Sequence, residues 1–311
     1  MAPGIKGTCY DPAFPCEPGP SPCLSITALG TADLAGAVHL SESAHWNQTL
    51  ADWRCMLALG QGWAIHASDQ AGVVQLAAST VVLPYGTHFA WISMVLVLPE
   101  FRRHGLASQL LRHAVAELAA RELAAVLDAT PAGHAVYQSH GFRDCWGFAR
   151  YRREARASLS VLPPRLPGPA TRPLRDSDWP AIAALDQPAF GADRQPLLRA
   201  LAARLPAAAR VVEQNGHLRG FVFGRDGREA SQIGPLLADD MITAQCLIGD
   251  TLGAIEGPVF VDLLDRCAAL VPWLQQQGFI FQRPFTRMLH GASVAPGDNR
   301  TIVLVAGPEL G

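Results

Sequence analysis

The sequence predicts an α/β protein in which two copies of one mixed-sheet fold follow each other along the chain. Helical and extended patterns alternate in both halves, and they occur in nearly the same order. The pair Gly278-Phe279 lies 137 residues (278 − 141) after Gly141-Phe142, and Asp262 lies 134 residues (262 − 128) after Asp128. Because equivalent residues recur at a nearly constant offset, we interpret the chain as an internal repeat.

The expected elements of the first half follow from apolar periodicity and from turn residues. Helices are expected over about 31–43 and 48–59, and strands over about 62–67, 73–83 and 89–98, with turns at 69–72 and 84–86. A helix then starts at Leu106, where apolar residues recur at helical spacing. A short buried strand over 123–129, a helix over 132–140 and a last strand near 143–151 complete this half.

The second half repeats this order after a proline-rich stretch. Residues 178–187 and 194–205 have helical patterns, and Asn215-Gly216 is a strong turn signal between strands at 208–214 and 217–225. The remaining expected elements are a strand at 231–237, a helix at 240–255, a strand at 259–264 and a helix at 267–277.

These patterns divide the chain into four parts. Residues 1–23 contain six prolines and are expected to be an irregular extension. Residues 158–171 are rich in proline and are expected to be a linker. We therefore expect one domain over 24–157 and a second over 172–311.

Composition excludes several functional classes. The chain has 311 residues, 49% of them hydrophobic and 17% charged, with a formal net charge of −2. Such a charge gives no reason to expect nucleic acid or an acidic membrane surface as a partner. The sequence contains no apolar run as long as a membrane span and no secretory signal, so a cytoplasmic protein is expected. A monomer or a homodimer is expected.

The seven cysteines do not indicate a metal site. Cys9, Cys16 and Cys23 recur every seven residues, which suggests a metal or disulfide framework at first sight. No pair has Cys-x-x-Cys spacing, however, and the total is odd. We interpret these three as reduced thiols in the N-terminal extension, and we expect no metal.

One segment carries the main functional signal, because an apolar strand, a glycine-containing turn and a helix follow one another there. The turn is Arg102-Arg103-His104-Gly105-Leu106-Ala107. The first turn of a helix has unpaired N–H groups and a partial positive charge, and a glycine allows a ligand to approach the backbone. The segment therefore predicts a site for phosphate oxygens. It lacks the glycine patterns of dinucleotide and nucleoside-triphosphate loops.

The form Arg-x-x-Gly-x-Ala resembles the pyrophosphate loop of the GNAT superfamily of N-acyltransferases, whose ligand is acetyl-coenzyme A. Tyr137 followed by Gly141-Phe142 resembles the Tyr-x-x-x-Gly-Phe signature of the same superfamily. The chain also resembles a bacterial two-domain group with a degenerate GNAT-like C-terminal copy. The segments shared with that group are Trp46–Thr49, Leu127–Gly133, Ile233–Pro235 and Arg283–Met288.

This resemblance implies tandem GNAT-like folds with one acetyl-coenzyme A site. The second copy has no such loop and has Leu274 at the tyrosine position, so the first half alone is expected to bind the cofactor. Tyr137 is the implied general acid for the departing thiolate. The implied cofactor-binding residues are Val95, Leu96, Val97, Arg102, Arg103, His104, Gly105, Leu106, Ala107, Ser108 and, in place of an asparagine common in the family, Thr130.

The sequence identifies the residues that line the acceptor site less clearly than those that bind the cofactor. Trp46, Asn47, Gln48 and Asp128 are expected to line it, although helix capping and core packing are equally compatible with the first three. The strand over 89–98 has no carboxylate, so the base is bulk water, a water chain, or Asp128 or His45 acting through water. Asp128 is equally consistent with a buried structural carboxylate.

The predicted function is an acetyl-coenzyme A-dependent N-acetyltransferase that acts on a small amine by direct attack in a ternary complex. The alternative is a non-catalytic acyl-coenzyme A sensor, for which a general acid is not needed.

Overall fold

The computed structural model describes residues 25–68, 72–155 and 167–311. The expected extension over 1–23, most of the turn at 69–72 and most of the linker at 158–171 lie outside the described residues. Within them, helices and strands alternate as the sequence predicts, and the strands form a mixed sheet. The predicted α/β class is confirmed.

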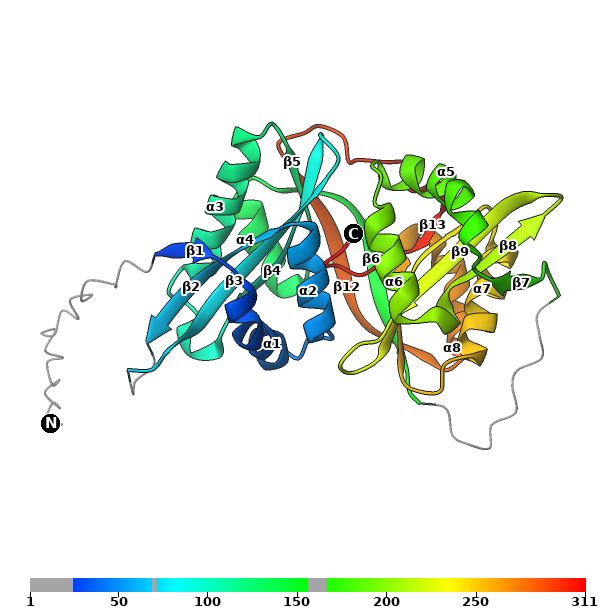
Figure 1. Ribbon diagram of the computed structural model, residues 1–311, viewed down its shortest axis with the longest axis horizontal. Helices are drawn as coiled ribbons and strands as arrows, with labels where there is room; N and C mark the ends of the chain where they lie inside the picture. The colour runs from blue at the N-terminus through cyan, green and yellow to red at the C-terminus, as the bar shows by residue number, and fades with distance from the viewer. Residues whose placement is uncertain (1–24, 69–71, 156–166) are drawn as a thin grey trace, which may run out of the picture.

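The two halves contain equivalent elements (Figure 1). The first half contains β1 (Ile26–Ala28), α1 (Leu34–Ser43), α2 (Leu50–Leu59), β2 (Gln61–Ser68), β3 (Val74–Tyr85), β4 (Phe89–Val97), α3 (Leu106–Ala120), β5 (Ala124–Ala129), α4 (Pro131–Ser139) and β6 (Arg143–Arg153). The second half contains β7 (Thr171–Pro173), α5 (Trp179–Phe190), α6 (Gln195–Arg204), β8 (Arg210–Gln214), β9 (His217–Arg225), β10 (Ser231–Ala238), α7 (Met241–Gly253), β11 (Val259–Leu264), α8 (Val271–Gln276), β12 (Phe279–His290) and β13 (Ile302–Leu304).

Several elements differ from the sequence prediction. The short edge strands β1 and β7, the long strand β12 and the short strand β13 were not expected. The expected helix over 267–277 is a 3-10 segment over Asp265–Leu270 followed by the short α8. A short edge strand and a helix of one or two turns carry too few residues to show a period, which explains most of these differences.

The two halves do not form separate sheets. The thirteen strands of the described residues all belong to one sheet, in the order β1-β2-β3-β4-β5-β12-β6-β11-β13-β10-β9-β8-β7. β12 of the second half lies between β5 and β6, and β6 of the first half pairs with β11. The halves therefore exchange their last long strands, and both strands cross the centre of the molecule in Figure 1.

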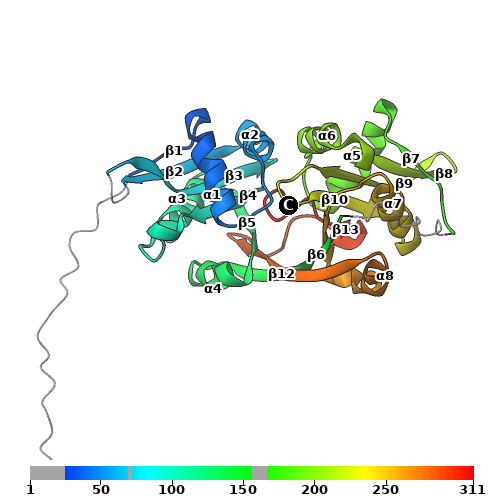
Figure 2. The same ribbon diagram turned by 90° about the horizontal axis from the view of Figure 1, so that it is seen from below.

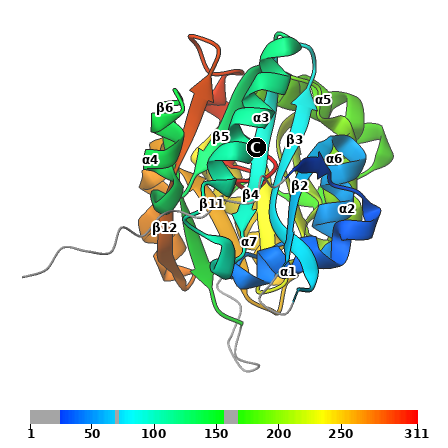
Figure 3. The same cartoon turned by 90° about the vertical axis from the view of Figure 1, so that its left-hand side faces the viewer.

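Helices cover both faces of this sheet. Figure 2 shows α1, α2, α5 and α6 on one face and α4 and α8 on the other, while Figure 3 shows α3 and α4 on the side opposite α1 and α2. The core on the α3 and α4 face includes Leu111, Ala114, Leu127 and Phe142. α3 follows β4 along the chain and α4 follows β5, and both helices lie on this face. Their N-terminal ends therefore lie on either side of the space between β4 and β5.

The exchange gives the molecule an approximate internal two-fold symmetry. Phe148 of β6 lies opposite Phe285 of β12 in the antiparallel register, and the two positions differ by the repeat offset of 137 residues (285 − 148). Their rings stack with centroids 4.9 Å apart and planes inclined by 10°. Equivalent side chains in contact indicate that the approximate symmetry axis passes between them.

Two buried ion pairs follow the same symmetry. Arg287 of β12 donates two hydrogen bonds, of 2.8 and 2.9 Å, to the Asp128 carboxylate of β5. Arg150 of β6 donates two bonds, of 2.8 and 2.7 Å, to the Asp262 carboxylate of β11. Each pair joins the fifth strand of one half to the exchanged strand of the other half. The pairs thus stabilise the exchanged arrangement rather than either half alone.

We predict that Asp262→Asn strongly destabilises the fold. The substitution leaves the buried Arg150 guanidinium without a counter-charge, and breaking a buried ion pair costs about 3–5 kcal/mol. The free energy of unfolding, measured by urea denaturation, should fall by about this amount. Asp298→Asn removes the same charge from a pair at the surface, with Arg300 85% exposed, and should leave the urea midpoint unchanged. Equal stability of the two variants would contradict a structural role for the buried pair.

Candidate active site

The site begins where two parallel strands separate. β4 pairs with β5 over Phe89–Trp91 and Ala124–Val126, and no pairing follows beyond these residues. From Ile92 onward the strands diverge, so backbone groups of both strands face an open space. Unpaired strand backbone needs other partners, and a ligand with amide groups can supply them.

A β-bulge redirects β4 at this point. The register with β3 shifts between Ser79 and Val81, and Met94 has a left-handed φ of 51°. The Ser79 hydroxyl donates to Met94 O at 2.8 Å, and the Thr80 hydroxyl donates to Ser93 O at 3.4 Å. A bulge leaves one residue out of the ladder. The buried hydroxyls hold the bulge in place, so the backbone after Met94 is available to a ligand.

The predicted phosphate loop lies at the end of the same strand. Gly105 is the N-cap residue of α3 with a φ of 77°, and Arg103 also has a left-handed φ, of 67°. Arg102 Nε donates to Val97 O at 3.2 Å, which fixes the loop to β4. Leu106 turns its side chain into the core, so it can offer a ligand only its backbone. The loop has the geometry that an oxyanion site at a helix N-terminus requires.

Tyr137 projects from α4 on the opposite side of the opening. Thr130 caps this helix, with its hydroxyl oxygen accepting from Gly133 N at 3.4 Å. A Cβ on Gly133 would lie 2.9 Å from Cε2 of Tyr137, so the glycine lets the ring lie flat against its own helix. The Tyr137 hydroxyl makes no hydrogen bond within the described residues, and burial raises the pKa of Tyr137 to about 12. The phenol is therefore protonated at neutral pH.

These elements enclose a groove, here called the cofactor groove, with about 1400 Å³ of space between its atoms and part of it open to solvent. Many of the sequence-predicted cofactor residues line it, whereas His104, Gly105, Leu106 and Ser108 lie at its end on the loop and first helical turn. The groove is lined by Ala44, Trp46, Val95, Leu96, Val97, Arg102, Arg103, Ala107, Leu111, Asp128, Thr130, Ala132, Gly133, Val136 and Tyr137.

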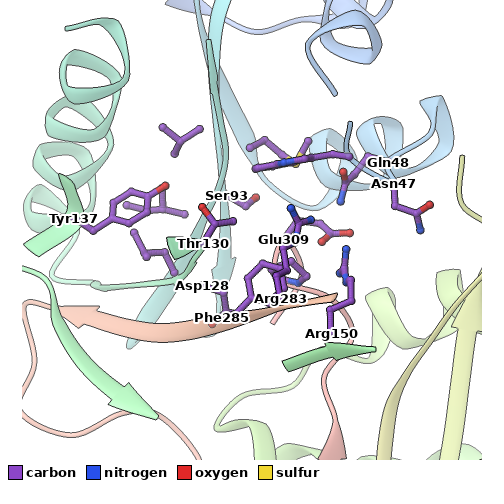
Figure 4. Close-up of a pocket in the computed structure, with 16 residues that line it drawn as sticks. Asn47, Gln48, Ser93, Asp128, Thr130, Tyr137, Arg150, Arg283, Phe285 and Glu309 are labelled. Carbon is purple, nitrogen blue, oxygen red and sulfur yellow. The ribbon is translucent and has the colours of Figure 1, made fainter. Parts of the chain in front are cut away.

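A second pocket, here called the acceptor pocket, adjoins the groove. It has about 490 Å³ of space between its atoms, part of it open to solvent, and it shares Trp46, Val95, Asp128, Thr130 and Tyr137 with the groove. Figure 4 shows Tyr137 and Thr130 at one end and Glu309, Arg283 and Arg150 at the other. The further lining residues are Asn47, Gln48, Ile92, Ser93, Met94, Leu127, Phe285 and Pro308.

Asp128 lies at the junction of the two spaces but is fully engaged. Both of its carboxylate oxygens accept from Arg287, whose guanidinium lies 4.2 Å from the Trp91 ring centroid and 4.0 Å from that of Trp146. Burial raises the pKa of the Asp128 carboxyl, although Arg287 opposes the shift. Asp128 is thus a buried carboxylate paired with an arginine, which agrees with the structural role that the sequence left open. His45 lines neither space.

The expected acceptor residues Asn47 and Gln48 have different environments. The Asn47 side chain donates to Ala230 O at 2.9 Å and accepts from the N–H groups of Glu229 and Ala230, so it joins the two halves. Gln48 is 3% exposed, and its Oε1 atom has no hydrogen-bond partner within the described residues. Trp46 forms a wall of both spaces. Of this segment, Trp46 and Gln48 are available to a ligand.

Three charged residues of the pocket were not among the site residues predicted from the sequence. Arg150 has a signal, because it lies one repeat offset (287 − 150) before Arg287. For Arg283, which lies in the shared segment, the sequence left open a carboxylate-binding role at the interdomain cleft and favoured a surface salt bridge, but Arg283 makes no ion pair within the described residues. Glu309 has no signal, because it follows the repeated unit. Its carboxylate pairs with Arg225, and its Oε2 atom has no partner.

The equivalent space of the second half is filled by the chain itself. β10 and β11 pair in parallel over Ser231–Ile233 and Val259–Val261 and then diverge, and β13 lies between them. A Cβ on Gly234 would collide with Val305 O, so the glycine permits this close approach. In addition, the Asp240 carboxylate accepts from Thr243 N at 2.7 Å at the start of α7. An anionic ligand would meet both a filled space and a negative charge there.

Comparison with known families decides the assignment. Residues 61–144 and residues 182–303 each match a model described as the acetyltransferase (GNAT) domain. The chain is a two-domain protein of the GNAT acetyltransferase family. The sequence-based assignment of tandem GNAT folds is confirmed.

Relatives with known sequence or structure agree with this family. The chain is 24% identical over 196 residues to the uncharacterized N-acetyltransferase YitH of Bacillus subtilis (strain 168), and the match covers 60% of this chain and 65% of that protein. A putative acetyltransferase of Pyrococcus horikoshii has the same fold, with a TM-score of 0.73, 18% identity and coverage of 95% of this chain and 99% of that one. A tandem GNAT protein from the clavulanic acid biosynthesis pathway gives a TM-score of 0.61 at 14% identity, covering 87% and 99%.

The described residues contain neither a metal-binding cluster nor a membrane-spanning helix. No cluster of three or more His, Cys, Asp and Glu side chains is placed to hold a metal ion there. No helix in these residues is both long and apolar enough to cross a membrane.

We predict that Gly105→Glu in this GNAT protein abolishes binding of acetyl-coenzyme A while the fold is retained. The position is exposed with open space around it, but a side chain there adds strain and a negative charge where phosphate oxygens would lie. Gly216→Glu is the matched control, because Gly216 has a φ of 75° and equally open surroundings in the β8–β9 turn. Calorimetry should show loss of affinity in the first variant only. Unchanged affinity in a folded Gly105→Glu variant would contradict the phosphate site.

Proposed function

We propose that the protein is an acetyl-coenzyme A-dependent N-acetyltransferase that transfers the acetyl group to a small-molecule amine in a ternary complex. The observation that supports this most directly is the junction of the two spaces at Tyr137, Thr130 and Val95. A thioester entering from the groove and an amine entering from the pocket would meet there. Holding two reactants in this way supplies much of the rate enhancement of such reactions.

The described residues offer partners for the pyrophosphate, the pantetheine arm and the thioester of the cofactor. Arg102, Arg103 and the first turn of α3 would hold the pyrophosphate, and the backbone of Val95–Val97 would pair with the pantetheine arm. The bulge at Met94 leaves backbone N–H groups that would polarise the carbonyl of the thioester. Coenzyme A, when bound, supplies the activated acetyl group and the thiolate leaving group.

Tyr137 would donate a proton to that thiolate. Burial raises the pKa of the Tyr137 phenol to about 12, whereas an ordinary thiol has a pKa of about 8.5. Proton transfer from the phenol to such a thiolate is therefore unfavourable by about 5 kcal/mol. A thiolate held beside the Tyr137 ring would lose part of its hydration as well, which raises the pKa of its thiol and narrows the pKa difference between the thiol and the phenol. The hydroxyl has no other partner among the described residues, so its proton is available for this step.

The second half would take part without binding a cofactor of its own. β13 occupies the space between β10 and β11, and Leu274, at the tyrosine position, is fully buried. This half instead supplies Arg283, Phe285 and Glu309 to the acceptor pocket. The degenerate copy would therefore build the acceptor side of the first half's site.

We predict that Tyr137→Phe slows the chemical step by roughly 10²-fold or more, the range for a lost general acid. The substitution keeps the ring on Gly133 and should leave the affinity for acetyl-coenzyme A unchanged. Single-turnover release of free thiol is the appropriate measurement, because product release can mask the effect in steady state.

Tyr151→Phe serves as the matched control, because it removes a hydroxyl that lines neither space. Its single-turnover rate should equal that of the wild type. A wild-type rate in Tyr137→Phe would leave Tyr137 as a packing residue and favour the sensor alternative.

A further inference from the structure

The end of the acceptor pocket away from Tyr137 holds three buried polar atoms without partners. They are Glu309 Oε2, Gln48 Oε1 and Arg283 Nε. Two of them are acceptors, and the third is a donor on a cationic side chain. Buried polar groups are normally satisfied, so unpaired atoms that face one pocket indicate where a ligand makes its hydrogen bonds.

Arg283 lacks a counter-charge. It makes no ion pair or hydrogen bond within the described residues, whereas its neighbour Arg150 is held by the Asp262 carboxylate. Its contact is with the Phe285 ring, whose centroid lies 5.2 Å from the guanidinium carbon. Burial lowers the pKa of Arg283, and the positive charge of Arg150 lowers it further. An anionic group at this position would offset both the burial of the Arg283 charge and its repulsion from Arg150.

Glu309 is held rigidly with one oxygen free. Its Oε1 atom pairs with Arg225, and Arg225 Nη1 also donates to Ala306 O at 2.6 Å. The surrounding backbone is fixed to the first half, because Trp91 Nε1 donates to Pro308 O at 3.0 Å and the Tyr85 hydroxyl donates to Leu310 O at 2.7 Å. A carboxylate oxygen so placed is suited to a cationic donor such as an ammonium group.

We propose that the acceptor is a small zwitterionic amine, whose oxyanion is bound by Arg283, whose further donor groups are bound by Glu309 and Gln48, and whose reacting amine extends toward the junction at Tyr137. This inference rests on the proposed transferase function. The planar fork of an arginine suits a carboxylate or a phosphate equally, so the shared chemistry is an amine that carries an oxyanion. Ile92, Met94 and Phe285 offer apolar walls for the carbon skeleton between the two charged groups.

Matched acceptors test this proposal without any substitution. Two quantities are measured for each acceptor: the rate of acetyl transfer, and the affinity by calorimetry in the presence of coenzyme A. The matched pairs are alanine and alaninamide, 4-aminobutyrate and butylamine, and O-phosphoethanolamine and ethanolamine. In at least one pair the anionic member should be preferred by roughly tenfold or more, the factor that one charge-assisted hydrogen bond provides. The carboxylate pairs and the phosphate pair distinguish the two sources of the oxyanion.

Substitutions of Arg283 then assign the preference to its side chain. Arg283→Met should raise the KM and Kd for the anionic acceptor by roughly tenfold to a hundredfold and leave the neutral partner unchanged. Arg283→Lys keeps the charge and should retain part of the preference, which also guards against a general folding defect. Arg300→Met, at an exposed arginine outside the pocket, is the control and should match the wild type.

The outcomes separate this inference from the proposed function. Transfer to neutral amines as efficient as to their anionic partners would overturn the zwitterion proposal and leave the transferase function intact. Anion preference that persists in Arg283→Met would also overturn it. Arg283-dependent binding of the anionic members without any acetyl transfer would support the ligand class and contradict the transferase function.

Discussion

The antiparallel pair of β6 and β12 determines where the functional groups of this molecule lie. Each strand continues the sheet of the other half, and each carries an arginine that pairs with a buried aspartate across the exchange. Neither half can bury these charges alone, because the partner of each aspartate comes from the other half. The two ion pairs and the stacked Phe148 and Phe285 rings therefore hold the two halves together.

This coupling explains how a degenerate repeat remains useful to the first half. The cofactor groove is lined entirely by residues of the first half, whereas the acceptor pocket also contains Arg283 and Phe285 of β12 and Glu309 of the C-terminal segment. That segment first fills the space between β10 and β11 and then continues into the pocket. One stretch of chain thus occupies the second half's opening and supplies a carboxylate to the first half's site.

The sequence predicted what local chemistry and the repeat could reveal. The glycine turn before α3, Tyr137 on α4 and the equivalence of Asp128 and Asp262 were all readable from spacing. The strand exchange was not readable from the sequence. The alternation of side chains along β6 or β12 is the same whether the strand pairs within its own half or with the other half. Glu309 could not be found because it lies outside the repeated unit, and the partners of Asn47 lie 182 and 183 residues away along the chain.

We propose that the molecule has one cofactor site, in the first half, and that this site faces an acceptor pocket to which both halves contribute. A crystal structure of the full chain grown with saturating coenzyme A is the decisive test of this arrangement. We expect density for one coenzyme A per chain, between β4 and β5 with its pyrophosphate at the start of α3, while β13 stays between β10 and β11. Density for coenzyme A between β10 and β11, with β13 displaced, would contradict it.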